Sequence, residues 1–411
     1  MDFLKSQTPL SAKTALVVLS VLMFFFSAQV SLTIYVDSSY LEQAITKSPT
    51  LAQTALWQDP EAVVGTLYSF ASLITILGLV LAPRVLRRQG NYRWTLSIII
   101  LHILLLLGLA LFDAAWLIIP MFIVETALVS ILYFNFDVFL ERYSRDGETG
   151  VIRGLFLVIG SIAWLLPPFF AGSIIEHSGY QLVYLSGAAI MVPTVFIMFR
   201  YFSDFQDLAY DDVPVMMSHA ESAKHPDIGH ILGANFFLHF FYALMIIYAP
   251  LYFLNHLNIS HEQFGLMLTI ALSAFIIFPY PAGWLADKVL GEKELLVGGF
   301  LLMAISAALI PIIGDAPIGI MLWALVLFVG RAGASIVESM AEAYFFKKID
   351  GHNAGLIGYF RRSRPLAFIV APIIASILMK FEIIELSGLF YVLAAVMLIA
   401  IYFPLRLRDT K

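Results

Sequence analysis

No cysteine occurs among the 411 residues of this sequence, which excludes disulfide bonds, thiolate nucleophiles and cysteine-based metal sites. Charged residues are also scarce, at 13% of the chain against about 25% in a typical soluble domain. The net charge of −5 offers no basic surface for nucleic acid. Neither a Walker-type phosphate loop nor an H-E-x-x-H histidine pair is present, so we expect no cofactor, no metal and no enzymatic activity.

Hydrophobic residues, in contrast, make up 60% of the chain, and the mean hydropathy is +0.88. A helix that crosses a bilayer needs about 20 mostly apolar residues. Twelve runs meet this requirement: 13–36, 62–83, 94–112, 116–140, 151–174, 180–201, 229–254, 263–286, 295–314, 317–345, 354–379 and 386–404. We therefore predict an all-α membrane protein with twelve transmembrane helices.

Lysine and arginine are distributed unequally between the gaps that separate these runs. Of the 24 Lys and Arg residues, 21 lie at the termini or in alternate gaps, and the other gaps hold only Lys47 and Lys380. Positively charged loops of membrane proteins remain in the cytoplasm. Both termini are therefore predicted to be cytoplasmic, in a multi-pass protein of the cell membrane. The one remaining cation, Arg331, lies inside an apolar run.

Short sequence matches relate the two halves of the chain. Residues 34–36 match 247–249, residues 64–67 match 264–267, and Asp146-Gly147 matches Asp350-Gly351, at offsets of 213, 200 and 204 residues. One explanation of these matches is the similar composition of membrane helices. The other is a parallel repeat of six helices, which is favoured because the three matches occur in the same order in both halves. The predicted organisation is an N-terminal half (1–202), a polar cytoplasmic linker (203–228) and a C-terminal half (229–411).

The loop after the eighth run has the form GWLADKVLGEK, residues 283–293. It resembles the G-x-L-A-D-R-x-G-R-K loop of the major facilitator superfamily, with one extra residue before Gly291. In such a loop Gly283 permits tight helix contact, and Asp287 accepts backbone N–H groups or pairs with a cation. Lys288 would hold the loop at the lipid headgroups. A polar turn between two helices is the simpler alternative.

This resemblance implies two pseudo-symmetric six-helix bundles that transport a solute by alternating access. In that superfamily the first, fourth, seventh and tenth helices line a central cavity. The resemblance therefore directs attention to polar residues in those four runs, since an ionisable side chain in a membrane helix is costly unless it faces protein or water. The four loop residues Gly283, Asp287, Lys288 and Gly291 are expected to take part in gating.

Polar residues of the tenth run lie on one helical face. Arg331, Ser335, Glu338 and Glu342 are spaced by four, three and four residues. We expect this face to meet the cavity, with Arg331 and Ser335 binding substrate and Glu338 taking up a proton. Alternatively, Arg331 pairs with Glu338 or with an acid of another helix and only holds the helices together.

The fourth run repeats this stripe at an offset of 205 residues. Ser130 then corresponds to Ser335, and Asp137 corresponds to Glu342. Ser130 is a candidate substrate ligand. Asp137 and Glu342 are candidate gating acids near the cytoplasmic side, or else they lie among headgroups or pair with Arg142, Lys347 or Arg361.

Glu125 lies on another side of the fourth run, about 140° from Ser130 at ~100° per residue. It is near the middle of the membrane, so it either pairs with a neighbouring helix or stays protonated, because a buried carboxylate is costly to ionise. We treat it as a candidate proton carrier.

The seventh and first runs supply the remaining candidates. Asn235, His239 and Tyr242 form one face of the seventh run. His239 can change charge near physiological pH and so suits proton coupling as well as substrate binding; alternatively it is a hydrogen-bonded core residue. Gln29 in the first run is an uncharged candidate ligand.

Together these patterns favour a monomeric secondary transporter of a small solute in the lipid bilayer, coupled to protons. A transporter-like receptor or assembly subunit without flux is the alternative. The Arg361, Arg362 and Arg364 cluster is interpreted as a cytoplasmic lipid anchor.

Overall fold

The structure is a computed structural model that describes residues 12–52, 57, 59–143, 159–160, 162–207, 226–314, 316–348 and 354–408. Within these residues the secondary structure is helical and no strand occurs. The predicted all-α class is therefore confirmed.

The helices of the first half run between residues 12 and 201. They are α1 (Ala12–Thr33), α2 (Asp37–Thr46), α3 (Pro49–Ala52), α4 (Pro60–Gln89), α5 (Asn91–Leu111), α6 (Ala115–Tyr143), α8 (Pro167–Ser178) and α9 (Tyr180–Tyr201). The short helices α2 and α3 were not expected, because their polar residues give no apolar run.

The helices of the second half begin after the linker. They are α11 (Pro226–Leu251), the π-helical turn η3 (Tyr252–His256), α12 (His261–Leu272), α13 (Ala274–Ile277), α14 (Pro279–Lys288), α15 (Glu292–Ile313), α16 (Ile320–Lys348), α17 (Ala354–Lys380), α18 (Leu386–Ala400) and α19 (Tyr402–Leu405).

In the described part of the chain, 11 helical segments are long and apolar enough to cross a membrane. Many of their apolar side chains are exposed on the outside of the molecule, among them Leu104, Phe196 and Leu325. This is expected where lipid is the solvent. The predicted helix over residues 151–174 lies partly outside the described residues, so twelve crossings remain a prediction.

Proline has different effects along the second half. The π-helical turn η3 follows directly after Pro250, and Pro279 begins α14 after a bend at Phe278. Proline has no backbone N–H to donate, and its ring crowds the carbonyl group of the preceding helical turn. These two effects account for the π-helical turn and the bend. Pro365, in contrast, lies inside helix α17, which continues on both sides of it.

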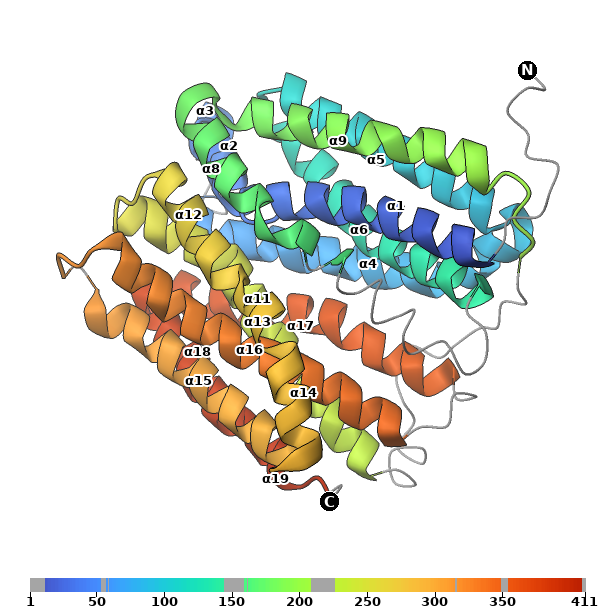
Figure 1. Cartoon of the computed structure of the whole chain (residues 1–411). Helices are drawn as coiled ribbons and strands as arrows, with labels where there is room; N and C mark the ends of the chain where they lie inside the picture. The colour runs from blue at the N-terminus through green and yellow to red at the C-terminus, as the bar shows by residue number, and fades with distance from the viewer. Residues whose placement is uncertain are drawn as a thin grey trace.

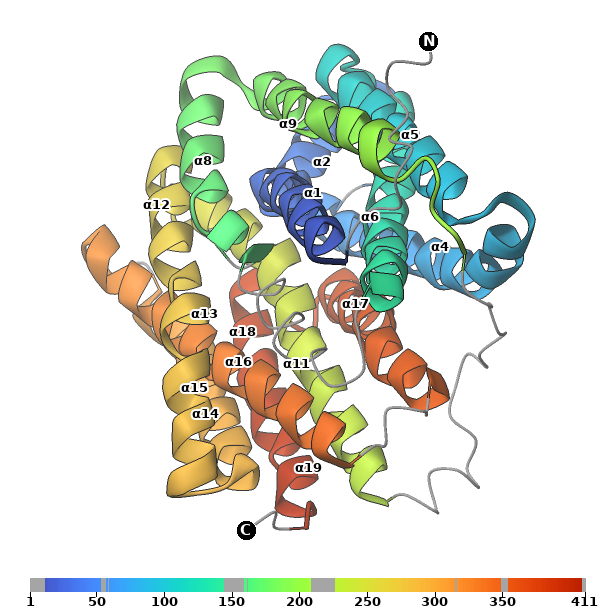
Figure 2. The same cartoon turned by 45° about the vertical axis from the view of Figure 1, so that its right-hand side comes forward.

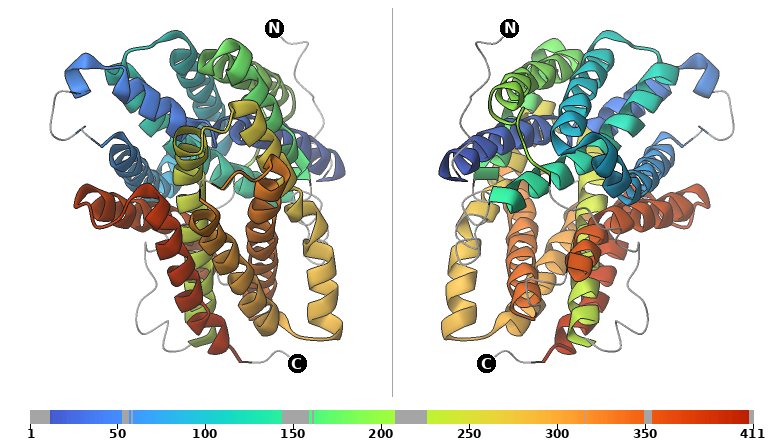
Figure 3. Two further views of the ribbon diagram at one scale, coloured as in Figure 1. Left: turned by 90° about the vertical axis from the view of Figure 1, so that its left-hand side faces the viewer. Right: turned by 90° about the vertical axis from the view of Figure 1, so that its right-hand side faces the viewer.

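Helices of the first half lie on one side of the molecule and helices of the second half on the other (Figures 1 and 2). The two sets meet mainly along two helix pairs, α4 with α17 and α8 with α12, and α11 also contacts α2 and α4. Figure 3 shows the same division from two further directions. These two pairs are therefore the contacts that any movement of one half against the other must change.

Glycine allows both helix pairs to approach closely. A Cβ atom at Gly265 in α12 would lie 2.4 Å from the carbonyl oxygen of Pro168 in α8. A Cβ atom at Gly65 in α4 would lie 2.7 Å from the hydroxyl oxygen of Ser376 in α17, and it would also meet the hydroxyl of Tyr248 in α11. The internal repeat aligns Gly65 with Gly265, so each half contributes one glycine of this pair to a contact with the other half.

Two ends of the molecule are distinguished by their elements. We call the end that carries α2, the start of α4 and the start of α12 the α2 face. The other end carries the start of α5, the α14–α15 turn and the end of α16, and we call it the linker face. There the Asp207 carboxylate accepts a 2.7 Å hydrogen bond from the backbone N–H of Asn91, at the start of α5.

Candidate functional site

Arg331 is the most deeply buried cation of the candidate site, with 3% of its surface exposed. Its guanidinium carbon lies 5.6 Å from the ring centre of Tyr35, 6.0 Å from that of Phe241 and 5.7 Å from that of Tyr242. These distances permit cation–π attraction. Tyr35 belongs to the turn after α1, whereas the other two rings belong to α11, so both halves of the chain surround the charge.

No carboxylate of the described residues forms an ion pair with Arg331. The nearby acid, Glu338, instead accepts a 3.0 Å hydrogen bond from the hydroxyl of Tyr242. The structure therefore contains no ion pair between Arg331 and Glu338, and that alternative is wrong. A buried cation without an anion is costly, so the arrangement suits an anionic group supplied from outside the chain.

Two further polar atoms near this cluster lack a partner. The hydroxyl of Ser335, one turn from Arg331 on α16, is buried and forms no hydrogen bond with a described residue. The same holds for the Nδ1 atom of His239, whose ring centre is 5.7 Å from that of Tyr242. Buried polar groups normally have a partner, so these two are available to a ligand or to water.

A second arginine near this cluster was missed by the sequence analysis. Arg364 in α17 is half-buried, and its charge acts on His239, Glu338 and Tyr133, the last of which belongs to α6. We had grouped it with the lipid anchors because it follows Arg361 and Arg362. Its place beside Pro365 in an apolar run was a usable signal.

The other substrate candidates have different surroundings. Asn235 donates a 3.1 Å hydrogen bond to the carbonyl oxygen of Phe360, so its amide joins α11 to α17. Gln29 is fully buried and contacts first-half residues, His102 among them. Ser130 lies half-buried on α6.

Glu125 contacts α5 rather than the Arg331 cluster. Its Oε1 atom lies 3.8 Å from Nδ1 of His102, and neither atom has a hydrogen-bond partner among the described residues. The other nitrogen of His102, Nε2, lies 2.8 Å from Oε1 of Gln29. Both Glu125 and His102 are buried, with 4% and 0% of their surface exposed.

The hydrogen-bond pattern restricts where a proton can lie in this chain of side chains. The side-chain NH₂ group of Gln29 donates a hydrogen bond to Thr33. The side-chain carbonyl oxygen of Gln29 therefore faces Nε2 of His102 and can only accept, so Nε2 carries the hydrogen. Nδ1 of a neutral His102 then presents a lone pair towards Glu125. A proton on Glu125 would therefore be directed towards an atom that can accept it.

Asp37, at the start of α2, is a second buried acid of the first half. Its carboxylate accepts a 2.7 Å hydrogen bond from the hydroxyl of Tyr184 in α9. Burial raises the pKa of the Asp37 carboxyl to about 7, although the hydrogen bond from Tyr184 lowers it. Sequence analysis missed this residue because it follows the first apolar run, where a loop was expected.

On the linker face, one arginine joins two of the candidate gating acids. Arg361 of α17 lies 3.9 Å from the carboxylate of Asp137 in α6 and 3.6 Å from that of Glu342 in α16. The interpretation of Arg361 as a lipid anchor is wrong, since its guanidinium faces protein carboxylates. The contact with Asp137 crosses from the second half to the first.

The loop that resembles the superfamily motif forms an ion-pair cluster within the second half. Lys347, at the end of α16, lies 3.2 Å from the Asp287 carboxylate and also bonds to the buried Glu292 at the start of α15. Gly291 has a φ of 128°, a conformation that favours glycine, at the residue before α15.

Gly283 and Lys288 of the same loop do not make the contacts that we expected of them. A Cβ atom at Gly283 would meet nothing within 4 Å, so the expected tight helix contact at this glycine is wrong. Lys288 is exposed and forms no ion pair with a described residue. Within the described residues, no group of three or more His, Asp or Glu side chains is placed to hold a metal ion.

Known proteins resemble this chain in family and in structure. Residues 231–411 match the Major Facilitator Superfamily. No curated protein matches the sequence. Among solved structures, an auto-inhibited POT family peptide transporter is similar with a TM-score of 0.75 and 11% identity, covering 96% of this chain and 98% of that one.

A second solved structure is a POT family transporter in complex with a thioalcohol-conjugated peptide. It has a TM-score of 0.70 and 13% identity, and the similarity covers 95% of each chain. At such low identity these structures establish the fold alone. The family match over residues 231–411 confirms that this multi-pass membrane protein resembles the Major Facilitator Superfamily, as the loop motif indicated, and the two solved structures share its fold over nearly the whole chain.

Proposed function

We propose that this protein moves a small solute with an anionic group across the membrane by alternating access, and that protons drive the movement. The binding site is the Arg331 cluster, in which Arg331, Ser335 and Tyr242 contact the solute. Arg364 adds positive charge from α17. Gln29, Ser130 and Asn235 have weaker support, because Gln29 and Asn235 already bond to the protein itself.

The buried, unpaired guanidinium of Arg331 carries this proposal. A charge in a membrane helix normally faces water or a partner, because its burial costs several kcal/mol. Here three aromatic rings from both halves surround the cation and no described carboxylate neutralises it. A solute carboxylate would complete the site and would contact both halves at once.

Short peptides belong among the first solutes to test, since the two solved structures of the same fold are described as peptide transporters or hold a peptide. A peptide has a carboxylate for Arg331 and an amino group for Glu338. Monocarboxylic acids and sugars are the matched comparisons, because they lack one or both of these charges.

Proton coupling has two structural supports. Glu338 and His239 lie beside the solute site, where a bound anion would change the energy of a proton on either group. Glu125 and His102 form the buried pair described above, and Asp37 is a further acid with a pKa near neutrality. Both arrangements can hold one proton in one state and release it in another.

Opening and closing would involve both ends of the molecule. On the linker face the ion pair of Arg361 with Asp137 joins the two halves, and the pair of Arg361 with Glu342 lies within the second half. The Asp287 cluster, with Lys288 and Gly291 in the same loop, fixes the turn between α14 and α15. In this proposal residues 1–202 and 229–411 rock as two units, and the linker face and both termini lie in the cytoplasm.

The deciding experiment combines binding with flux. Purified protein is screened by thermal shift against peptides, organic acids, nucleosides, sugars and lipophilic cations, and hits are tested for uptake into proteoliposomes. We expect anionic or zwitterionic solutes to stabilise the protein, and uptake to stop when the pH gradient is collapsed. Stabilisation by sugars or cations only would refute the anion site.

A receptor or assembly subunit without flux is the second candidate. It predicts the same stabilisation by a solute but no uptake under any ion gradient. The unpaired Arg331 suits both functions. Contacts between the halves at both ends of the molecule favour transport, because a transporter must close one end while the other is open and a receptor need not.

A further inference from the structure

Two histidine–glutamate contacts join the halves on the α2 face, and none of these four residues has a part in the proposed solute site. The first lies at the end of η3. Nε2 of His256 is 2.9 Å from Oε1 of Glu61, which belongs to the first turn of α4. The His256 ring also stacks on Tyr252 of its own turn, with ring centres 5.8 Å apart, and this stacking orients it towards α4.

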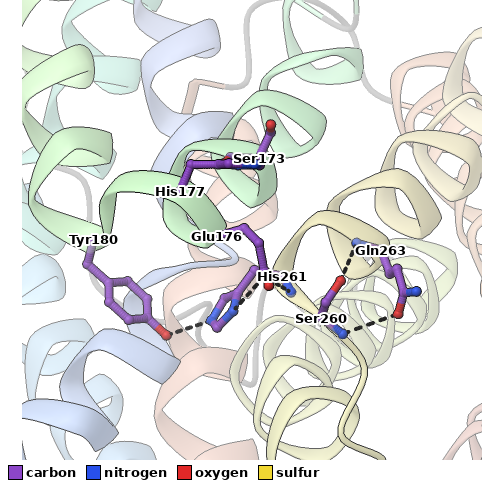
Figure 4. Close-up of polar contacts among 7 residues, drawn as sticks. All are labelled: Ser173, Glu176, His177, Tyr180, Ser260, His261 and Gln263. Carbon is purple, nitrogen blue, oxygen red and sulfur yellow. Dashed lines mark hydrogen bonds and ion pairs between the residues drawn. The ribbon is translucent and has the colours of Figure 1, made fainter.

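The second contact involves His261, the first residue of α12 (Figure 4). Its ring lies between two residues of the first half. Nε2 is 2.8 Å from the hydroxyl of Tyr180, and Nδ1 is 3.8 Å from Oε2 of Glu176. The backbone N–H of His261 donates to the same carboxylate at 3.2 Å. A capping box formed by Ser260 and Gln263 fixes the start of α12 and therefore the position of His261.

Both contacts depend on tight packing of the helices that carry them. A Cβ atom at Gly172 in α8 would lie 2.2 Å from the carbonyl oxygen of His261 itself. On the other side, Ser376 of α17 donates a 2.8 Å hydrogen bond to the carbonyl oxygen of Ala62, the residue after Glu61. Separation of α8 from α12, or of α4 from α17 and η3, would break the corresponding pair.

The four side chains can exchange protons with the solution on this face. Their exposed fractions are 46% and 21% for His256 and Glu61, and 29% and 41% for His261 and Glu176. An open pocket of about 360 Å³ adjoins the second pair and is lined in part by Gln43, Lys47, Gln181 and His261.

The charged groups around each histidine favour attraction to an imidazolium. A protonated His256 faces the Glu61 carboxylate, on which two further acids, Asp59 and Glu42, also act. Around His261 the groups are Glu176, the Tyr180 hydroxyl, Glu262 of its own helix and Lys47 across the pocket. His177 of α8 bonds to the Ser173 carbonyl of its own helix and takes no part (Figure 4).

We propose that these two pairs form a proton-operated clasp that holds the α2 face closed. Protonation of His256 and His261 converts each contact into an ion pair and favours the closed state. Loss of those protons weakens both contacts and lets this face open. Burial lowers the pKa of His261, although Glu176 raises it. The closed state is therefore favoured in acidic solution and is weakened as pH rises through the range in which histidine loses its proton.

The test measures closure directly and needs no solute. Because the chain has no cysteine, Thr46→Cys with Ile383→Cys and Ser178→Cys with Asn255→Cys provide unique spin-label pairs across this face. Electron–electron distance distributions are recorded at about pH 5.5 and about pH 8. We expect the short-distance population to be favoured at the lower pH by roughly three- to tenfold, the size expected for two partly exposed ion pairs.

The matched variants separate the clasp from other effects of pH. His256→Gln with His261→Gln should abolish the pH dependence, whereas His177→Gln, an exposed histidine on the same face, should retain it. A pH-independent distribution in the unmodified background would overturn the proposal, even if the double variant does not fold. So would a double variant that keeps its pH response. Neither result depends on flux, so failure of the transport proposal would be recognised separately.

Discussion

The guanidinium of Arg331 lies over the ring of Tyr35, with 5.6 Å between the guanidinium carbon and the ring centre. The arginine belongs to α16 and the tyrosine follows α1, so this contact joins the two halves at the proposed solute site. A movement that separates the halves must also remove one aromatic neighbour from the cation. The contact therefore links the surroundings of the charge to the conformation of the transporter.

Arg331→Ala is expected to lower solute affinity by about 10- to 100-fold, because a hydrogen bond to a charged group contributes about 1.5–3 kcal/mol. Isothermal calorimetry with a hit from the solute screen measures the change. Arg200→Ala is the matched control, since Arg200 also lies over a tyrosine ring but is exposed at the end of α9. Equal affinity in both variants would remove Arg331 from the site.

Asp37→Asn should change the pH dependence of stability. The folded-state pKa of Asp37, about 7, lies above its ordinary value of 3.8, so the folded protein holds this proton more tightly. The resulting stabilisation is complete below about pH 3.8 and is lost as pH rises through 7. The introduced asparagine mimics the protonated carboxyl, so the variant should exceed the unmodified protein in Tm at pH 8 and match it at low pH.

The control for this comparison is Asp113→Asn, an exposed acid that accepts a hydrogen bond from Gln181. It should leave the pH profile of Tm unchanged. Tyr184→Phe should move the Asp37 transition to higher pH, because the lost hydrogen bond lowers the pKa in the unmodified protein. A shift to lower pH would contradict the assignment.

Gly265→Ala is expected to hold α12 away from α8, because its Cβ atom would lie 2.4 Å from the Pro168 carbonyl oxygen. The α2 face should then open more often. A cysteine at Ser39, which lines a small cavity between the halves beside Gly265, reports this as faster reaction with a water-soluble maleimide. Gly283→Ala, at a glycine with no neighbour within 4 Å of its Cβ position, should leave the rate unchanged.

Lys347→Met should destabilise the second half, because it removes the lysine that bonds to the buried Glu292 carboxylate. Lys347 is half-exposed, so we expect a loss of about 1–2 kcal/mol rather than the larger cost of breaking a fully buried pair. Chemical unfolding in detergent measures the difference. Lys288→Met, which removes an exposed lysine of the same loop, should cost less than about 0.5 kcal/mol.

The positions of the long helices were predictable because lipid imposes a length and an apolar composition on them. The stripe of α16 was predictable for a related reason, since Arg331, Ser335 and Glu338 share one face by spacing alone. Partners were not predictable, because periodicity says nothing about which helix lies opposite. Gln29 was expected to meet a solute, yet it bonds to His102, which is 73 residues away along the chain.

Buried residues outside the apolar runs were the other failure of the sequence analysis. Asp37 and Tyr40 lie in α2, whose composition resembles a loop, but α2 folds back against α4, α6 and α11. Hydropathy treats such a segment as exposed. Arg361 and Arg364 were misjudged for the opposite reason, because three arginines within four residues are typical of a segment that binds lipid headgroups.

The hydrogen bond between Asp207 and the start of α5 has a consequence for how the polypeptide could be divided. It fastens the first residues of the linker to the N-terminal half, and Gly90, with a φ of 75°, leaves room for the carboxylate. If the polypeptide were expressed as two fragments divided between residues 208 and 225, the first fragment would keep its anchored end. Co-expression of such fragments should restore the assembled molecule.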